Sequence, residues 1–160
     1  MRCIDPCCRF NPSMPEFYPV FTKDEVDLLI KKGIDKNNFT SEDGKHYTVV
    51  FKEKEGLHNL CPFVRDNMLC SIYENRPVDC KIWPFAIIRK EKGIYLAIDT
   101  KELCPGIKKR VGTEEYGEYV RYLIDYFGSN KITKMLKKYP KLMAKDHSDF
   151  EAICLLDKLR

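Results

Sequence analysis

Cysteine is the residue type in this sequence that points most directly to chemistry. Seven of the eight cysteines fall in two dense groups and one satellite position: Cys3, Cys7 and Cys8; Cys61, Cys70 and Cys80; and Cys104. Thiolate sulfur is the ligand that zinc, copper(I) and iron–sulfur clusters prefer. These seven cysteines are therefore predicted to bind a metal ion or a metal cluster.

A disulfide framework would use the same cysteines, but the sequence does not favour it. Disulfides persist in oxidising compartments and are typical of domains too small to bury a sufficient core, whereas 160 residues with 44% apolar side chains can bury one. The first ten residues, MRCIDPCCRF, contain no apolar run after Arg2, and no stretch approaches the roughly 18 apolar residues of a membrane span. We therefore expect a cytoplasmic protein with reduced cysteines and no membrane segment.

The spacing of the cysteines excludes the regular short-range metal motifs. The sequence reads Cys-x3-Cys-Cys at the start and then Cys61-x8-Cys70-x9-Cys80, with Cys104 after 23 intervening residues. Zinc fingers and ribbons use paired Cys-x2-4-Cys knuckles, and ferredoxins use equally compact runs. The predicted site must instead be assembled from distant loops that folding brings together.

The residues around the cysteines resemble a known family. The stretch CPFVRDNMLCSIYENRPVDCKIWPF, residues 61–85, contains in order the CPF, CxIY, RPxxC and PF motifs of the YkgJ-like cysteine-cluster family, the CxxCxxCC domain, and it follows CIDPCC at residues 3–8. The resemblance covers roughly residues 3–105 and implies chelation of zinc or iron. The family usually opens with C-x2-C-x2-C-C, whereas here only Cys3 precedes the Cys7-Cys8 pair, so Cys104 is the candidate for the missing ligand.

Chemical arguments favour an iron–sulfur cluster over zinc. Seven cysteines exceed the needs of one tetrahedral ion; they suit one [4Fe–4S] cluster with three cysteines to spare, or two zinc ions that share six or seven thiolates. An apolar shell protects a cluster and tunes its potential. The residues expected to form that shell, unless they only pack the core, are Phe63, Tyr73, Trp83 and Phe85.

Two functions from different classes follow. The first is a [4Fe–4S] protein that serves electron transfer or an iron-dependent modification reaction, because the cysteine pattern also resembles that of the flagellin lysine N-methylases. The chain is nevertheless short for a separate S-adenosylmethionine domain, and it has no glycine-rich strand-to-helix turn, so whether it is an enzyme stays open. The alternative is a non-catalytic, structural zinc-binding module that mediates protein interactions.

Other polar residues near the cysteines have simpler interpretations. Arg76 can offset the charge of several thiolates or hold an anionic ligand. Arg9 is expected to form a surface salt bridge, and His58, three residues before Cys61, is expected to be exposed rather than a ligand. Cys154, between two apolar residues of a predicted helix, is expected to be structural.

The pattern of elements predicts an α+β fold. We expect a small antiparallel β-sheet or hairpin with cysteine-rich loops, followed by a C-terminal set of α-helices, in a single domain, 1–160. Residues 3–105 would be the metal-binding part and residues 106–160 a helical scaffold. The elements expected are a capped helix over 22–33, strands over 46–52, 85–90 and 94–99 in one sheet with Gly93 in the hairpin turn, and helices over 113–128, from 132 to near 140, and from 148 onward.

Charge gives little information about partners. The net charge is +4, and lysines at 131, 134, 138, 141 and 145, together with Lys108-Lys109-Arg110, make a basic stretch that would suit RNA or an acidic protein. A solvated helix face is the preferred interpretation because no aromatic-interleaved nucleic-acid motif accompanies it. We therefore expect no nucleic acid, and a protein or redox partner that the sequence does not identify.

Overall fold

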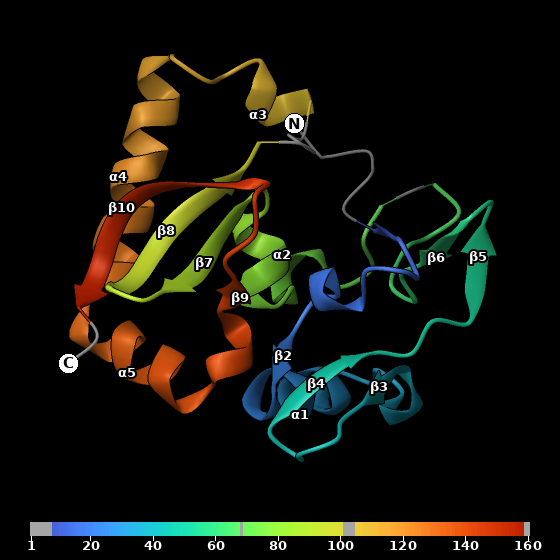
Figure 1. The fold of residues 1–160 in the computed structure, drawn as a ribbon. Coiled ribbons are helices and arrows are strands. Elements are labelled where there is room, and N and C mark those ends of the chain that lie inside the picture. Colours follow the sequence, from blue (N-terminus) through green and yellow to red (C-terminus); the bar gives the residue numbers. More distant parts are fainter. Residues whose placement is uncertain (1–7, 68, 101–104, 159–160) are drawn as a thin grey trace. The chain divides into compact units, whose positions relative to one another are not determined.

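The computed structural model describes residues 8–67, 69–100 and 105–158. The chain forms two compact units, Met1–Lys81 and Ile82–Arg160, each with its own sheets (Figure 1). Small antiparallel sheets and helices confirm the α+β prediction. The division into one domain with parts at 3–105 and 106–160 stays a prediction.

The first unit contains a capped helix on a three-stranded sheet. Helix α1, Lys23–Lys31, begins at Thr22, whose hydroxyl accepts from the backbone N–H of Glu25 while the Glu25 carboxylate accepts from Thr22 N–H. This reciprocal pair satisfies two of the amides that a helix start leaves without partners. Gly33 follows the helix at φ +89°, a left-handed conformation that glycine adopts without strain. The helix predicted over 22–33 is confirmed.

The first unit contains two three-stranded antiparallel sheets. The first has the order β2-β4-β3 and the second the order β1-β6-β5. Their strands are β1, Arg9–Phe10; β2, Phe21–Thr22; β3, Phe39–Thr40; β4, His46–Val49; β5, Glu53–Glu55; and β6, His58–Leu60. The short helical segments are the 3-10 turns η1, Pro15–Phe17, η2, Lys36–Asn38, and η3, Tyr73–Asn75, with helix α2, Val78–Ile82, at the boundary between the units.

The core of the first unit joins α1 to the cysteine-bearing loops. Its buried members are Phe21, Val26, Leu29, Val49, Phe63 and Ile72. Cys61 and Cys70 are partly buried and pack against this cluster. The loops that carry these two cysteines are therefore anchored by apolar residues in the same core as α1.

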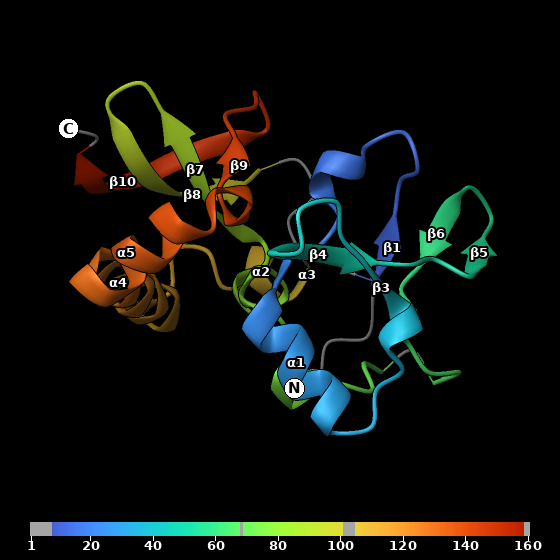
Figure 2. The same ribbon diagram turned by 90° about the horizontal axis from the view of Figure 1, so that it is seen from below.

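The second unit is a four-stranded sheet with helices on one side (Figure 2). The strand order is β10-β8-β7-β9, antiparallel except for the parallel pair β7–β9. The elements are β7, Phe85–Lys90; β8, Gly93–Asp99; α3, Pro105–Lys108; α4, Glu114–Gly128; α5, Asn130–Lys138; η4, Pro140–Leu142; β9, Ala144–Lys145; and β10, Phe150–Lys158. The predicted hairpin and the helices over 113–128 and from 132 are confirmed.

Three expectations about strands and turns were wrong. Strand β4 pairs with β2 and β3 rather than with the hairpin, because strand partners depend on tertiary packing that local propensity does not contain. The predicted last helix is strand β10, which covers an edge of the buried strand β8. Two register shifts in β10, after Ala152 and after Leu155, break the alternation by which a strand is recognised. Gly93 is the first residue of β8, where a Cβ would collide with the Asp157 carbonyl, so close strand approach rather than a turn requires glycine there.

No helix in the described part of the chain is long and apolar enough to cross a membrane.

Candidate metal centre

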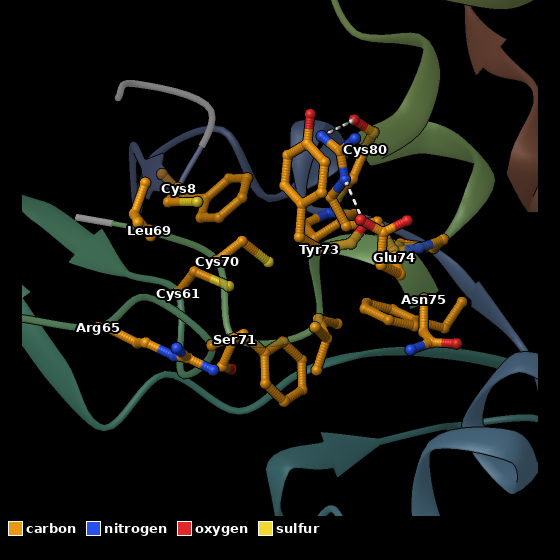
Figure 3. Close-up of a pocket in the computed structure, with 17 residues that line it drawn as sticks. Cys8, Cys61, Arg65, Leu69, Cys70, Ser71, Tyr73, Glu74, Asn75 and Cys80 are labelled. Carbon is orange, nitrogen blue, oxygen red and sulfur yellow. Dashed lines mark hydrogen bonds between the residues drawn. The ribbon is translucent and has the colours of Figure 1, made fainter. Parts of the chain in front are cut away.

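Four of the seven predicted ligands line one cavity in the first unit. The cavity has a volume of about 280 Å³, and Cys8, Cys61, Cys70 and Cys80 all contribute to its walls (Figure 3). Each of the four side chains is half-buried. In the view of Figure 3 the sulfur atoms of Cys61 and Cys70 point into the same part of the cavity.

Backbone hydrogen bonds connect three of these cysteines. The N–H of Cys61 donates to the carbonyl of Cys8 at 2.9 Å, immediately before the β1–β6 pairing. The N–H of Val64 donates to the Cys61 carbonyl at 3.1 Å, and Val64 forms an isolated antiparallel bridge with Cys70. Cys8, Cys61 and Cys70 are thus connected through main-chain contacts that do not depend on any particular side chain.

Apolar residues beside the cysteines anchor these loops in the core. Phe63 and Ile72 are 3% and 5% exposed, and each lies two residues after a cysteine, Cys61 and Cys70 respectively. The N–H of Ser71 donates to the Phe63 carbonyl at 2.7 Å and joins the two loops. In each loop, therefore, a buried core residue fixes the position of a cysteine that lines the cavity.

Cys80 is positioned differently, by side-chain contacts made at the start of α2. The Glu25 carboxylate accepts from the N–H of Val78 at 3.2 Å, and the Asp79 carboxylate accepts from the N–H of Val20 at 2.9 Å. Burial raises the pKa of Asp79 to about 7; the hydrogen bond from Val20 lowers this pKa, and the nearby Glu25 carboxylate raises it. Reciprocal bonds thus tie the α2 start to the segment that leads into α1.

Arg76 provides a second connection to Cys80. Its Nε donates to the Tyr73 carbonyl at 3.0 Å and its Nη1 donates to the Cys80 carbonyl at 3.3 Å. The guanidinium carbon lies 3.9 Å from the centroid of the Tyr73 ring, within the range of a cation–π contact. Figure 3 shows the two hydrogen bonds beside the Tyr73 ring.

The apolar shell differs in part from the prediction. Phe63 and Tyr73 line the cavity as expected, whereas Trp83 and Phe85 belong to the second unit. Phe10 and Phe21, which sequence reasoning missed, also line it. Phe10 follows Cys8 by two residues, so proximity to a cysteine was the signal available for it; nothing local marked Phe21.

The described side chains do not by themselves enclose an ion. Among the described residues, no three cysteine, histidine or carboxylate side chains converge closely enough to hold a metal. Cys3, Cys7 and Cys104 lie outside the described residues, so the full ligand set stays a prediction.

Other candidate residues do not line the cavity. His58 is exposed on β6 and does not contribute to its lining, and Cys154 lies on β10 of the second unit, where burial raises the pKa of its thiol. Arg9 forms the expected surface salt bridge, with Glu55 at 2.6 Å.

The donor chemistry of the cavity fits a thiophilic metal group. Cysteine sulfur is the principal donor on its walls, and soft thiolates select zinc, copper(I) and iron–sulfur clusters. A single zinc ion lies about 2.3 Å from each thiolate, and one water accounts for about 30 Å³ of liquid volume, so a cavity of 280 Å³ has room for more than one bare ion. The donors on these walls therefore suit chelation of zinc or of iron.

These features define a protein whose cysteine-lined cavity is suited to chelation. Residues 1–110 match the family model CxxCxxCC, described as "Putative zinc- or iron-chelating domain". The chain belongs to this family, and the match confirms the resemblance of its cysteine motifs. No curated protein and no solved structure matches the chain.

Proposed function

We propose that this protein holds a [4Fe–4S] cluster in the cysteine-lined cavity of its first unit and uses it in electron transfer or in an iron-dependent modification reaction. The observation that carries the proposal is the presence of Cys8, Cys61, Cys70 and Cys80, from four separate segments, around one cavity. Four thiolates are the usual ligand set of such a cluster. When bound, the cluster would supply one-electron chemistry.

The shape and lining of the cavity favour a cluster over a structural zinc ion. Structural zinc sites are closed, and four protein ligands surround the ion directly. Here the sulfurs lie on the walls of a cavity of about 280 Å³ whose lining includes aromatic residues Phe10, Phe21 and Phe63. An apolar lining limits the access of water to a cluster and influences its potential.

Each described cysteine then has a defined role. Cys8, Cys61 and Cys70 would supply thiolates from the main-chain-connected wall, and Cys80 would supply one from the start of α2. Cys3, Cys7 and Cys104 remain candidates for further ligands. A protein redox partner and a cytoplasmic location complete the proposal.

Anaerobic purification followed by metal analysis tests this function. We expect a brown protein with broad visible absorbance and about four irons and four acid-labile sulfides per chain. Cys70→Ser should lower the iron content strongly, because it removes a ligand. Cys154→Ser is the matched control and should leave the iron content unchanged, because Cys154 lies on β10.

Two results would contradict the proposal. A colourless protein with stoichiometric zinc would instead support the structural zinc module, and chelation should then unfold the first unit because metal binding energy is folding energy. Equal iron loss in Cys70→Ser and Cys154→Ser would show that the cavity is not the binding site.

A further inference from the structure

Arg76 contacts both ends of the loop that presents Cys80. Its two hydrogen bonds reach the carbonyls of Tyr73, at 3.0 Å, and of Cys80, at 3.3 Å. Its guanidinium plane also lies over the Tyr73 ring, with 3.9 Å between the guanidinium carbon and the ring centroid. One side chain thus links η3, a cavity-lining aromatic residue and the predicted ligand on α2.

Backbone support of the loop between these contacts includes a hydrogen bond from the N–H of Lys81 to the carbonyl of Pro77, at 3.1 Å. Pro77 lies within the loop, is fully buried and has no N–H to donate. The Glu25 carboxylate accepts from the amide of Val78 and the Asp79 carboxylate accepts from the amide of Val20, and neither contact involves the Cys80 carbonyl. Arg76 therefore constrains Cys80 at its carbonyl, whereas the two carboxylate contacts involve Val78 and Asp79, which precede Cys80.

The chemistry of the contact requires arginine. The guanidinium group is planar, always charged and carries several donors in a rigid fork, so it can serve two carbonyls while its face stacks on an aromatic ring. A lysine ammonium is a compact point charge on a flexible stem and cannot reproduce that arrangement. A residue of this kind, in contact with a metal ligand, orients the ligand and changes metal affinity by roughly 10–100-fold.

We propose that Arg76 is a positioning residue for the metal centre, which holds Cys80 toward the cavity and places a permanent positive charge beside the thiolates. The proposal rests on the proposed function only in requiring that the cysteines bind a metal; it does not require that the metal be iron. Arg65, which lines the same cavity but is exposed, has no such role.

Cobalt(II) titration of the reduced, metal-free protein tests this role. Thiolate-bound Co²⁺ gives charge-transfer absorption whose intensity follows the number of sulfur ligands, and it can be measured at saturation. We expect Arg76→Gln to weaken Co²⁺ binding by about 10–100-fold and to lower the absorption as much as Cys80→Ser does. Arg76→Lys should lose a similar factor in affinity because it keeps the charge but not the fork.

The controls separate positioning from charge and from folding. Arg65→Gln removes a cationic side chain from the same cavity wall and should leave both affinity and absorption at the wild-type values. The double variant Arg76→Gln/Cys80→Ser should show the same absorption as Cys80→Ser alone, because Arg76 acts through Cys80. Thermal melting of each variant checks that the fold is retained.

The outcomes distinguish this proposal from the proposed function. If Arg76→Gln shows the same absorption as the wild type, the role of Arg76 is overturned and the metal centre is not. Equal losses in Arg76→Gln and Arg65→Gln would replace positioning by a general charge effect and would also overturn it. A wild-type protein without thiolate-to-cobalt absorption would overturn the metal centre itself, and the role of Arg76 with it.

Discussion

Phe63 should be the side chain on which the stability of the cysteine loops depends most. It is 3% exposed and its ring lies 5.6 Å from that of Phe39 and 6.3 Å from that of Phe21, centroid to centroid. It also lies two residues from Cys61, and its carbonyl accepts the N–H of Ser71. Truncation to alanine removes the ring from the core while the backbone hydrogen bond can remain.

The expected cost can be worked out in two ways. A buried phenylalanine removes about 150–250 Å² from water, which at about 25 cal/mol per Å² corresponds to about 4–6 kcal/mol. Measured Phe→Ala substitutions in protein cores cost about 3–5 kcal/mol. We therefore expect Phe63→Ala to lower the unfolding free energy of the first unit by about 4 kcal/mol, a large share of the roughly 5–15 kcal/mol of a whole domain.

Native-state hydrogen exchange is the suitable assay, because two compact units need not unfold together. The slowest amides of α1 and β4 report the first unit, and their protection should fall by the factor that corresponds to the free-energy loss. Leu57→Ala is the matched control; this side chain is 86% exposed, so its truncation should change stability by less than about 0.5 kcal/mol. A loss below about 1 kcal/mol for Phe63→Ala would refute the anchoring role.

Three further substitutions test local features of each unit. Thr22→Ala removes the capping hydroxyl of α1 and should cost the first unit about 1 kcal/mol; an unchanged urea midpoint would contradict this. Gly93→Ala places a methyl group against the β10 backbone and should destabilise the second unit by about 1–3 kcal/mol, whereas Gly128→Ala meets nothing within 4 Å, so equal melting temperatures of the two variants would count against the close approach. Hydrogen bonds from the amide and ring of His46 hold the pKa of Asp43 well below its usual value. Ionised Asp43 therefore stabilises the fold fully above the unfolded-state pKa of about 3.9 and loses this effect as the pH falls toward the lower folded-state pKa. The stability advantage of wild type over Asp43→Asn should shrink on acidification, and a difference that stays constant with pH would show the reasoning to be wrong.

Features fixed by neighbouring residues could be predicted from the sequence. The α1 start follows from a threonine and a glutamate three residues apart, and the α4 start from Thr113, whose hydroxyl accepts from the Tyr116 amide. These caps depend on short-range geometry that recurs wherever the residues recur. The β7–β8 hairpin was predictable for the same reason.

Features that depend on distant partners could not be predicted. The sequence predicts a helix around Cys154, because Ser148 and Glu151 resemble a capping box and the bulges of β10 disturb the strand alternation; pairing with the edge of β8 explains why this segment is extended. The pairing of Cys61 with Cys8 crosses more than fifty residues, and no local pattern encodes it. For Arg76 the RPxxC motif gave a usable signal, because the cysteine whose carbonyl Arg76 binds lies four residues after it in the chain.

The four described cysteines differ in what holds them, and this difference determines which of them a single side-chain substitution can move. Cys8, Cys61 and Cys70 are connected through backbone hydrogen bonds and a β-bridge, which most side-chain substitutions leave in place. Cys80 depends on side-chain contacts, which join the Glu25 carboxylate to the Val78 amide, the Asp79 carboxylate to the Val20 amide, and the Arg76 guanidinium to the Cys80 carbonyl. Substitutions there can change the position of one thiol without unfolding the other three. The properties of a metal group in this cavity would therefore be tuned chiefly through Cys80.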